Sequence, residues 1–425
     1  MIMPTNLYEN PRLFFIVTTI AALLVLITLF LVLSVLRRFW NDRTYRKLDT
    51  LRKEYALRIR RMLGPDGSGE DEAWTAIAPG SLSWMALDQV LLDLMDEGRH
   101  EDELRGLYCR FGYTAFYENR LGSRRVTTKA AAVDKLGRMR CSSSLPRILP
   151  LLNEAEPEIL VVTVRALSRI GSTEGLAAVI ARLPELLGRS LVTRKAMDTA
   201  LIQFGDVAIP YLLAYRDERS DPWVLSCVLE TLSHLSPDAR STEFAGAFLG
   251  HANPEVRSKA LKVLGRPGIA LPEALADPVL RLLDDPAWFV RIQAIKTAES
   301  ALRDRAAEPI ARLLFDTNWH TRNTAADALT KYGNRALQII FDALASTDHY
   351  AKESICEELE NTGFSDILLG NLGSADETVR ALSENILRTM HGLHFSTPLL
   401  EHLSQGNDGV ISGKVRDILQ EGIRS

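Results

Sequence analysis

Two histidines near the C-terminal end of the sequence have a spacing that could hold a metal ion. His391 and His394 stand three positions apart, so a helix would place both imidazoles on one face, and His402 follows. Gly392 interrupts such a helix, however, and no acidic or cysteine ligand stands at a matching spacing. We therefore interpret these residues as surface histidines and expect no metal site.

The four cysteines also lack a catalytic or metal-binding pattern. None forms a C-x-x-C pair, which argues against a disulfide framework or a zinc knuckle and suits a reducing compartment. Nucleotide-binding loops, nucleophile elbows and zinc-protease motifs are absent from the sequence. We expect no catalytic residue, no cofactor and no small-molecule substrate. We interpret the four cysteines as small buried apolar residues, and they are Cys109, Cys141, Cys227 and Cys356.

A run of aromatic residues has the spacing of a binding surface. Trp288, Trp319 and Tyr350 are 31 positions apart, and Trp223 follows Asp221-Pro222 in an equivalent turn. Residues at such a period should line one edge of a repeated structure. They could pack between repeats, or they could form an aromatic ridge that grips a partner protein, since Trp and Tyr are favoured interface anchors. The sequence leaves both readings open.

These aromatic residues recur because the sequence itself repeats from about residue 124. Several segments run from an anchor residue to a glycine 11 positions later, and successive glycines are 30–34 residues apart or about twice that. Such a period indicates stacked helix pairs, since one pair cannot bury its apolar face alone. Segments with this spacing are 126–137, 160–171, 194–205, 257–268, 322–333 and 352–363.

Each repeat carries the signals of two helices. A turn rich in Asp, Asn and Pro precedes the first helix, as in Asp285-Pro286, where proline suits the first helical turn. Alanine, valine and leucine then recur at three- and four-residue spacing, and the glycine should end the helix at positive φ. A second apolar helix closes the unit. The predicted fold class is all-α, an α-solenoid of helix pairs in a right-handed superhelix.

The segment PEVRSKALKVLG, at 254–265, resembles the bacterial HEAT repeats of the phycobilisome-lyase-like group. PAWFVRIQAI at 286–295 and ETVRALSENIL at 377–387 are similar to the same family, and the tetratricopeptide signature is missing. The resemblance covers roughly 124–425 and implies about nine HEAT-type units. It implies little about activity, because the recurring residues are packing residues. Some relatives attach or isomerise bilins on cysteines, which makes such an enzyme the third candidate function.

The resemblance also implies a role for the anchor arginines. In such repeats these arginines usually form a ladder with aspartates of the turns, and the candidate aspartates here are Asp285, Asp316 and Asp376. A structural ladder is the first reading and ligand recognition the second. The arginines assigned to this ladder are Arg194, Arg257, Arg291, Arg322 and Arg380.

The N-terminal part of the chain has the composition of a membrane anchor. Residues 13–36 contain no charge over 24 positions, against about 20 apolar residues needed to cross the hydrocarbon core. The stretch is too long for the apolar region of a signal peptide, and no A-x-A site follows it. Phe39, Trp40 and Tyr45 stand just beyond it, where an aromatic belt is expected. We predict a single transmembrane helix.

A basic segment follows the apolar stretch and predicts the orientation. Residues 37–61 carry ten Lys or Arg against three acidic residues, whereas the whole chain has a net charge of −4 and a pI of about 6.1. The positive-inside rule places the solenoid in the cytoplasm and the N-terminus outside, at the inner membrane. The basic residues could also attract anionic headgroups, and the candidates for this are Arg37, Arg38, Arg43, Arg46 and Lys47.

The complete prediction divides the chain into six parts. They are a tail at 1–12, a transmembrane helix at 13–36, a basic helix at 37–63, a linker at 64–72, a helical cap at 73–123 and a solenoid at 124–425. Because the body is acidic, we expect no nucleic-acid partner. The sequence favours a membrane-tethered scaffold for a protein partner, such as the cytoplasmic domain of a membrane protein. The alternative is a regulatory adaptor that recruits a soluble protein.

Overall fold

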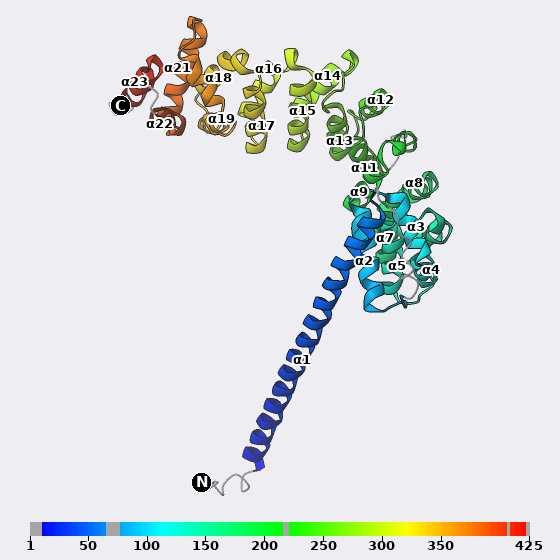
Figure 1. Ribbon diagram of the computed structural model, residues 1–425. Helices are drawn as coiled ribbons and strands as arrows, with labels where there is room; N and C mark the ends of the chain where they lie inside the picture. Colours follow the sequence, from blue (N-terminus) through cyan, green and yellow to red (C-terminus); the bar gives the residue numbers. More distant parts are fainter. Residues whose placement is uncertain (1–10, 65–76, 216–220, 406–408, 422–425) are drawn as a thin grey trace, which may run out of the picture. The chain divides into compact units, whose positions relative to one another are not determined.

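A computed structural model describes residues 11–64, 77–215, 221–405 and 409–421, with only the backbone described at 11–13, 41 and 421 (Figure 1). All regular secondary structure in these residues is helical. The predicted tail at 1–12 and linker at 64–72 fall mostly outside the described residues. The chain forms two compact units, which are Met1–Leu151 and Leu152–Ser425.

The first unit begins with one long helix, α1 (Pro11–Met62), of 52 residues. The apolar stretch and the basic stretch are therefore parts of a single unbroken helix. The apolar side chains at 14–36 are exposed throughout, and this is the one described helix that is long and apolar enough to cross a membrane. Near its C-terminal end, Leu48, Tyr55 and Ile59 are buried, and α1 packs against α2 (Leu82–Asp96).

Short helices complete the first unit. Ser81 caps α2 by accepting a hydrogen bond from the backbone N–H of Trp84 at 3.1 Å. Gly112 has a φ of 82° and divides the next helical stretch in two. The remaining elements are α3 (Glu101–Arg110), α4 (Tyr113–Arg120), α5 (Val126–Arg138), η3 (Ser142–Ser144), α6 (Leu145–Ile148) and η4 (Leu149–Asn153).

The second unit is built from two alternating sets of helices (Figure 1). The first set packs helix to neighbouring helix from α7 to α19. Its members are α7 (Pro157–Ile170), α9 (Arg194–Gln203), α11 (Pro222–Leu232), α13 (Pro254–Leu264), α15 (Trp288–Ala301), α17 (Trp319–Thr330), α19 (His349–Asn361), α21 (Glu377–Gly392) and α23 (Val410–Glu421).

The second set fills the intervals and often continues into a 3₁₀ turn. It consists of α8 (Thr173–Gly188), η5 (Gly205–Ala208) with α10 (Ile209–Leu212), α12 (Ala239–Ala247), α14 (Glu273–Arg281) with η6 (Leu282–Asp284), α16 (Arg303–Arg312) with η7 (Leu313–Phe315), η8 (Gly333–Ala336) with α18 (Leu337–Leu344), α20 (Phe364–Asn371) and α22 (Thr397–Ser404). Small alanines such as Ala294 and Ala325 are fully buried in the first set, which lets its helices pack closely.

Most of the periodic glycines stand where the chain leaves a first-set helix. Those at 171, 205, 268, 333 and 363 have φ between 59° and 83°, a conformation that only glycine adopts at low cost. Gly137 departs from this prediction. It lies inside α5, and the residue with positive φ after that helix is Arg140.

Candidate protein-binding surface and arginine ladder

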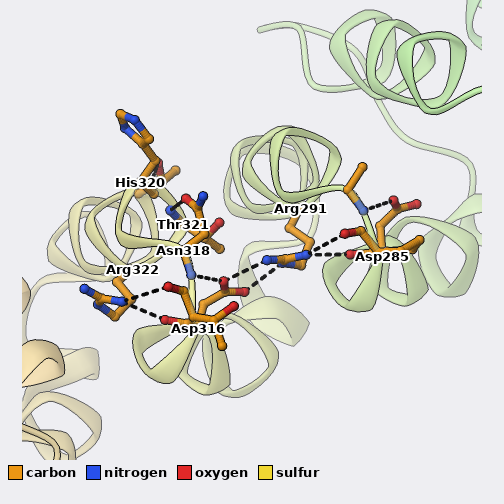
Figure 2. Close-up of polar contacts among 11 residues, drawn as sticks. Asp285, Arg291, Asp316, Asn318, His320, Thr321 and Arg322 are labelled. Carbon is orange, nitrogen blue, oxygen red and sulfur yellow. Dashed lines mark hydrogen bonds and ion pairs between the residues drawn. The ribbon is translucent and has the colours of Figure 1, made fainter.

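Two arginines of the second unit form a ladder between consecutive helices of the first set. Arg257 in α13 donates from Nε and Nη2 to the two carboxylate oxygens of Asp285, both at 2.8 Å. Arg291 in α15 donates in the same way to Asp316, both at 2.7 Å (Figure 2). All four side chains are at most 13% exposed, so these are bidentate, largely desolvated pairs.

A third donor of each guanidinium is bound within its own repeat. Nη1 of Arg257 donates to the backbone oxygen of His251 at 2.8 Å, and Nη1 of Arg291 to that of Asp285 at 2.7 Å. Arg322 and Arg380 repeat this bond with the oxygens of Asp316 and Ser374, both at 2.8 Å. Each of the four arginines is the fourth residue of its helix and bonds to the residue six positions before it. The repeat therefore fixes the guanidinium from one side before any carboxylate is added.

The arrangement differs around Arg380 and at Arg194. Asp376, the expected aspartate near Arg380, caps α21 by accepting from the backbone N–H groups of Thr378 and Val379. Arg194 is the first residue of α9, not the fourth, so it does not occupy the ladder position. Its Nη1 lies 3.4 Å from the hydroxyl of Ser226, and its guanidinium carbon lies 5.2 Å from the centroid of the Trp223 ring.

The four predicted aromatic residues are all on the surface of the second unit. Trp223 and Tyr350 are the second residues of α11 and α19, and Trp288 and Trp319 are the first residues of α15 and α17. Their exposed fractions are 58%, 68%, 43% and 56% in that order. Packing alone would bury rings of this size, so much of each ring is available to a partner.

The sequence did not single out His320, which lies in the middle of this row. Its imidazole is stacked at 5.5 Å from the Trp288 ring and at 3.5 Å from the Trp319 ring, centroid to centroid. The two indoles are therefore no more than about 9 Å apart, close to the usual spacing of packed helices. His320 occupies the same helical position as Phe289 and Tyr350, and that register was the available signal. We call Trp288, His320, Trp319 and Tyr350 the aromatic row.

The predicted membrane-surface residues are exposed on α1. Arg37, Arg38, Arg43, Arg46 and Lys47 precede Leu48, where burial against the first unit begins. The histidines near the C-terminal end bind serines instead of converging. His391 Nδ1 is 2.7 Å from the Ser396 hydroxyl, and the described residues contain no group of three or more His, Cys, Asp or Glu placed to hold a metal.

The cysteines show the burial expected of apolar residues, with one exception. All four are free, and Cys109 is exposed. Burial raises the pKa of Cys141 to about 11 and that of Cys356 to about 12, and it raises the pKa of Cys227 as well. These three thiols are therefore protonated and poorly nucleophilic at neutral pH.

A buried polar cluster in the first unit escaped the sequence analysis. Asp88 of α2 is 5% exposed and accepts hydrogen bonds from the hydroxyls of Tyr108 at 3.0 Å and Tyr117 at 2.8 Å. Lys135 of α5 completes the cluster with its Nζ 2.9 Å from the carboxylate. Burial, and then the neighbouring Asp88 charge, raise the pKa of both tyrosines. The cluster joins four helices, α2 to α5.

A second ionic cluster joins α11 and α13. Glu230 lies 2.9 Å from the Nζ of Lys259 and 2.6 Å from that of Lys262, and His234 is 3.2 Å away. Burial acts to raise the pKa of Glu230, but hydrogen bonds from the two lysines outweigh it, so that the pKa falls to about 2. The carboxylate is therefore ionised at neutral pH and links neighbouring repeats.

A groove of about 620 Å³ lies on the second set of helices. It runs between α16 and α18, with Phe315 at 45% exposure as its large apolar residue. Its charged lining is mixed, with Glu308 and Asp342 beside Arg312 and Arg335. This groove and the aromatic row belong to different elements of the same repeats.

Comparison with known proteins identifies the repeat type. A family model described as HEAT repeats matches residues 276–360. No curated protein matches the sequence. Among solved structures, an engineered protein is 15% identical over 80% of this chain and 96% of its own, with a TM-score of 0.30.

Two karyopherin structures are also similar to this chain. Kap121p bound to Nup53p is 14% identical over 87% of this chain, with a TM-score of 0.44, and Kap121p bound to the extreme C-terminus of the protein phosphatase Cdc14p is 12% identical over 88%, with a TM-score of 0.38. The chain spans about half the length of these two, 48% and 53%. The prediction of HEAT repeats is confirmed for residues 276–360, and the prediction of an all-α fold agrees with the described residues.

Proposed function

We propose that this protein is a membrane-anchored scaffold that binds another protein on the aromatic row of its HEAT repeats. The observation that carries the proposal is the exposure of large aromatic rings in the first turn of α15, α17 and α19. HEAT repeats form extended surfaces that bind partners, and exposed Trp and Tyr are the residues that anchor such interfaces. We place the partner among the cytoplasmic domains of membrane proteins, in a bacterial inner-membrane complex.

The anchor is the first part of α1. Its 24 uncharged residues would span about 36 Å as a helix, enough for a hydrocarbon core of about 30 Å with some tilt. A soluble protein would have to cover this surface, yet all its side chains from 14 to 36 are exposed. The basic residues that follow support an orientation with the solenoid in the cytoplasm and the N-terminus outside.

The unbroken helix sets the distance of the first unit from the membrane. At 1.5 Å per residue, Arg37 and Arg38 would lie among the headgroups, whereas Lys47 would lie about 16 Å above the hydrocarbon edge. Attraction to anionic lipid weakens within a Debye length of about 8 Å, so Arg37 and Arg38 contribute most to it. Because Leu48, Tyr55 and Ile59 pack on α2, the tether is a rigid extension of the first unit.

The test is crosslinking in cells followed by extraction in mild detergent, with the full-length chain as bait. Trp288→Ala with Trp319→Ala should remove the captured partner, whereas Phe315→Ala, a control of similar exposure on the other set of helices, should keep it. Loss of the partner with Phe315→Ala alone, or equal capture by all variants, would contradict the proposal.

A truncated chain separates the scaffold from the adaptor. It must retain residues 41–62, since removing Leu48, Tyr55 and Ile59 would expose the surface of α2. A membrane protein captured only by the anchored chain supports the scaffold. A soluble protein captured by both chains would support a regulatory adaptor instead.

A further inference from the structure

The arginine ladder ends at a residue that keeps the geometry of a rung. Nη1 of Arg322 donates to the backbone oxygen of Asp316 at 2.8 Å, the same bond that holds Arg257 and Arg291. In those two residues, Nε and Nη2 then bind a carboxylate of the next repeat. In Arg322, Nε reaches only the hydroxyl of Ser354 at 3.5 Å, and no carboxylate in the described part of the chain pairs with it.

The missing carboxylate has a definite place in the sequence. Asp285 and Asp316 stand six residues before the fourth residue of α15 and of α17, and Ser346 stands six residues before Lys352, the fourth residue of α19. Serine has two fewer side-chain heavy atoms than aspartate, its hydroxyl oxygen lies one bond closer to the backbone, and it carries no charge. The hydroxyl oxygen of Ser346 is itself buried and has no hydrogen-bond partner among the described residues. The third rung therefore has its arginine and an unfilled acceptor position.

The surroundings of this gap open to a partner. Arg322 is half-buried, and its guanidinium carbon lies 5.7 Å from the centroid of the Tyr350 ring. Tyr350 is 68% exposed, and Trp319, three residues before Arg322, is 56% exposed. The gap thus lies within the aromatic row, and the rings of this row would pack on apolar side chains of the partner.

We propose that Arg322 receives a carboxylate side chain from the bound protein, which completes the third rung of the ladder in trans. This inference rests on the proposed function and specifies the chemistry of the partner. A guanidinium already fixed by one bond and half-removed from water binds a carboxylate bidentately with little further loss of freedom. The site would discriminate against the amide, because asparagine or glutamine would set an NH₂ group against a donor.

The charge around the gap restricts the partner further. Asp348 is close in sequence, but its carboxylate caps α19 by accepting from the backbone N–H of Ala351 at 3.0 Å. Asp316 is already bound to Arg291. A strongly acidic segment would meet these carboxylates and the net negative charge of the body. The chemistry therefore favours a single Asp or Glu flanked by apolar or aromatic residues.

The experiment fills the gap from within the chain. Ser346→Asp places a carboxylate at the ladder position, where it should pair with Arg322 and exclude the partner's acid. Full-length protein in detergent is applied to an array of peptides, each with one Asp or Glu among apolar residues, beside a twin carrying Asn or Gln. The unchanged protein should prefer the acidic twin by about tenfold or more, the effect of a charge-assisted hydrogen bond. Ser346→Asp should abolish that preference.

Ser374→Asp is the matched control, because it makes the same change in the equivalent turn of the following repeat, six residues before Arg380. It should leave the preference unchanged. Ser346→Asp should also slow hydrogen exchange in α17 and α19 by about tenfold, which shows that the rung has formed.

Four results would overturn the inference. Equal binding of the acidic and amide twins would contradict the carboxylate site, and so would an unchanged preference in Ser346→Asp. Neither result would contradict the scaffold function. Absence of any peptide binding would count against both. Unchanged exchange in Ser346→Asp would show that Arg322 does not face the gap as a rung.

Discussion

Replacing Asp316 with asparagine measures how strongly the ladder joins its repeats. The carboxylate accepts two hydrogen bonds from Arg291 at 2.7 Å and one from the backbone N–H of Asn318 at 2.7 Å. Asparagine keeps the shape of the side chain and an oxygen that can accept the hydrogen bond from the backbone N–H of Asn318. It removes the charge and sets an NH₂ group against one donor of the guanidinium. The substitution therefore isolates the ion pair from the turn.

The expected cost follows from burial. Arg291 and Asp316 are 13% and 7% exposed, so water can replace the lost bonds only in part. One charge-assisted hydrogen bond is lost and the other weakened, each worth about 1.5–3 kcal/mol. Breaking one side of a buried pair typically costs about 3–5 kcal/mol. We therefore expect Asp316→Asn to lower the local stability of α15 and α17 by about 3 kcal/mol.

Hydrogen exchange of the full-length protein in detergent is the suitable assay, because a solenoid opens locally and does not unfold in one step. A change of about 3 kcal/mol corresponds to exchange that is about a hundredfold faster in α15 and α17. Helices of the first unit such as α2 should be unchanged. Asp304→Asn is the control, since its pair with Arg335 is 90% and 78% exposed and should alter exchange little.

The double variant supplies the refutation. The double variant Arg291→Met with Asp316→Asn should lose much less local stability than the sum of the two single variants, because it leaves no buried charge without a partner. If the two effects simply add, or if Asp316→Asn speeds exchange less than about threefold, the ladder does not couple the repeats. Arg322 could then not be interpreted as a ladder arginine that lacks its carboxylate.

Three further predictions concern other contacts. The pKa of Glu230 is lowered to about 2, so the stability that this carboxylate contributes is complete above its ordinary pKa of 4.5 and is lost as the pH falls towards 2. The difference in denaturation midpoint between the unchanged protein and Glu230→Gln should therefore shrink as the pH falls from 4.5 to 2. The same difference should stay constant from pH 6 to 8. Asp88→Ala should destabilise α2 to α5 by about 3 kcal/mol in hydrogen exchange, since it leaves a lysine and two tyrosine hydroxyls without their acceptor, and an unchanged rate would contradict this. Gly265→Ala should speed exchange in α13 and α15, because a Cβ would lie 3.0 Å from the backbone Cα of Thr297, whereas Gly370→Ala, with nothing within 4 Å, should be neutral or stabilising.

The repeat period predicted the fold because packing imposes it. Alanines at three- and four-residue spacing, an Asp- or Asn-containing turn and a glycine at the helix end each meet a local requirement, so they recur in most units. The same reasoning failed where a local requirement was met differently. At Gly137 the helix continues, and Arg140 takes the positive φ.

The ladder was predictable in part. The arginines recur in register, but Arg194 shows that distance to the next glycine is not the same as position in the helix. Only the N-cap, set by Thr193, fixes the register, and it makes Arg194 the first residue of α9. The Asp88 cluster had no sequence signal, because its tyrosines and Lys135 come from separate helices whose packing is not periodic.

The turns before α15 and α17 each perform three tasks with neighbouring residues. In each turn the aspartate binds the arginine of the preceding repeat, and the same carboxylate accepts a hydrogen bond from a backbone N–H of the turn. The residues that follow begin the helix with an aromatic ring. Asp316, Asn318 and Trp319 do this within four positions. The ring is therefore held by the same turn that carries the rung. A partner that binds the aromatic row meets a surface whose spacing is set by the ladder beneath it, and the gap at Arg322 is the point where the partner itself can contribute to that spacing.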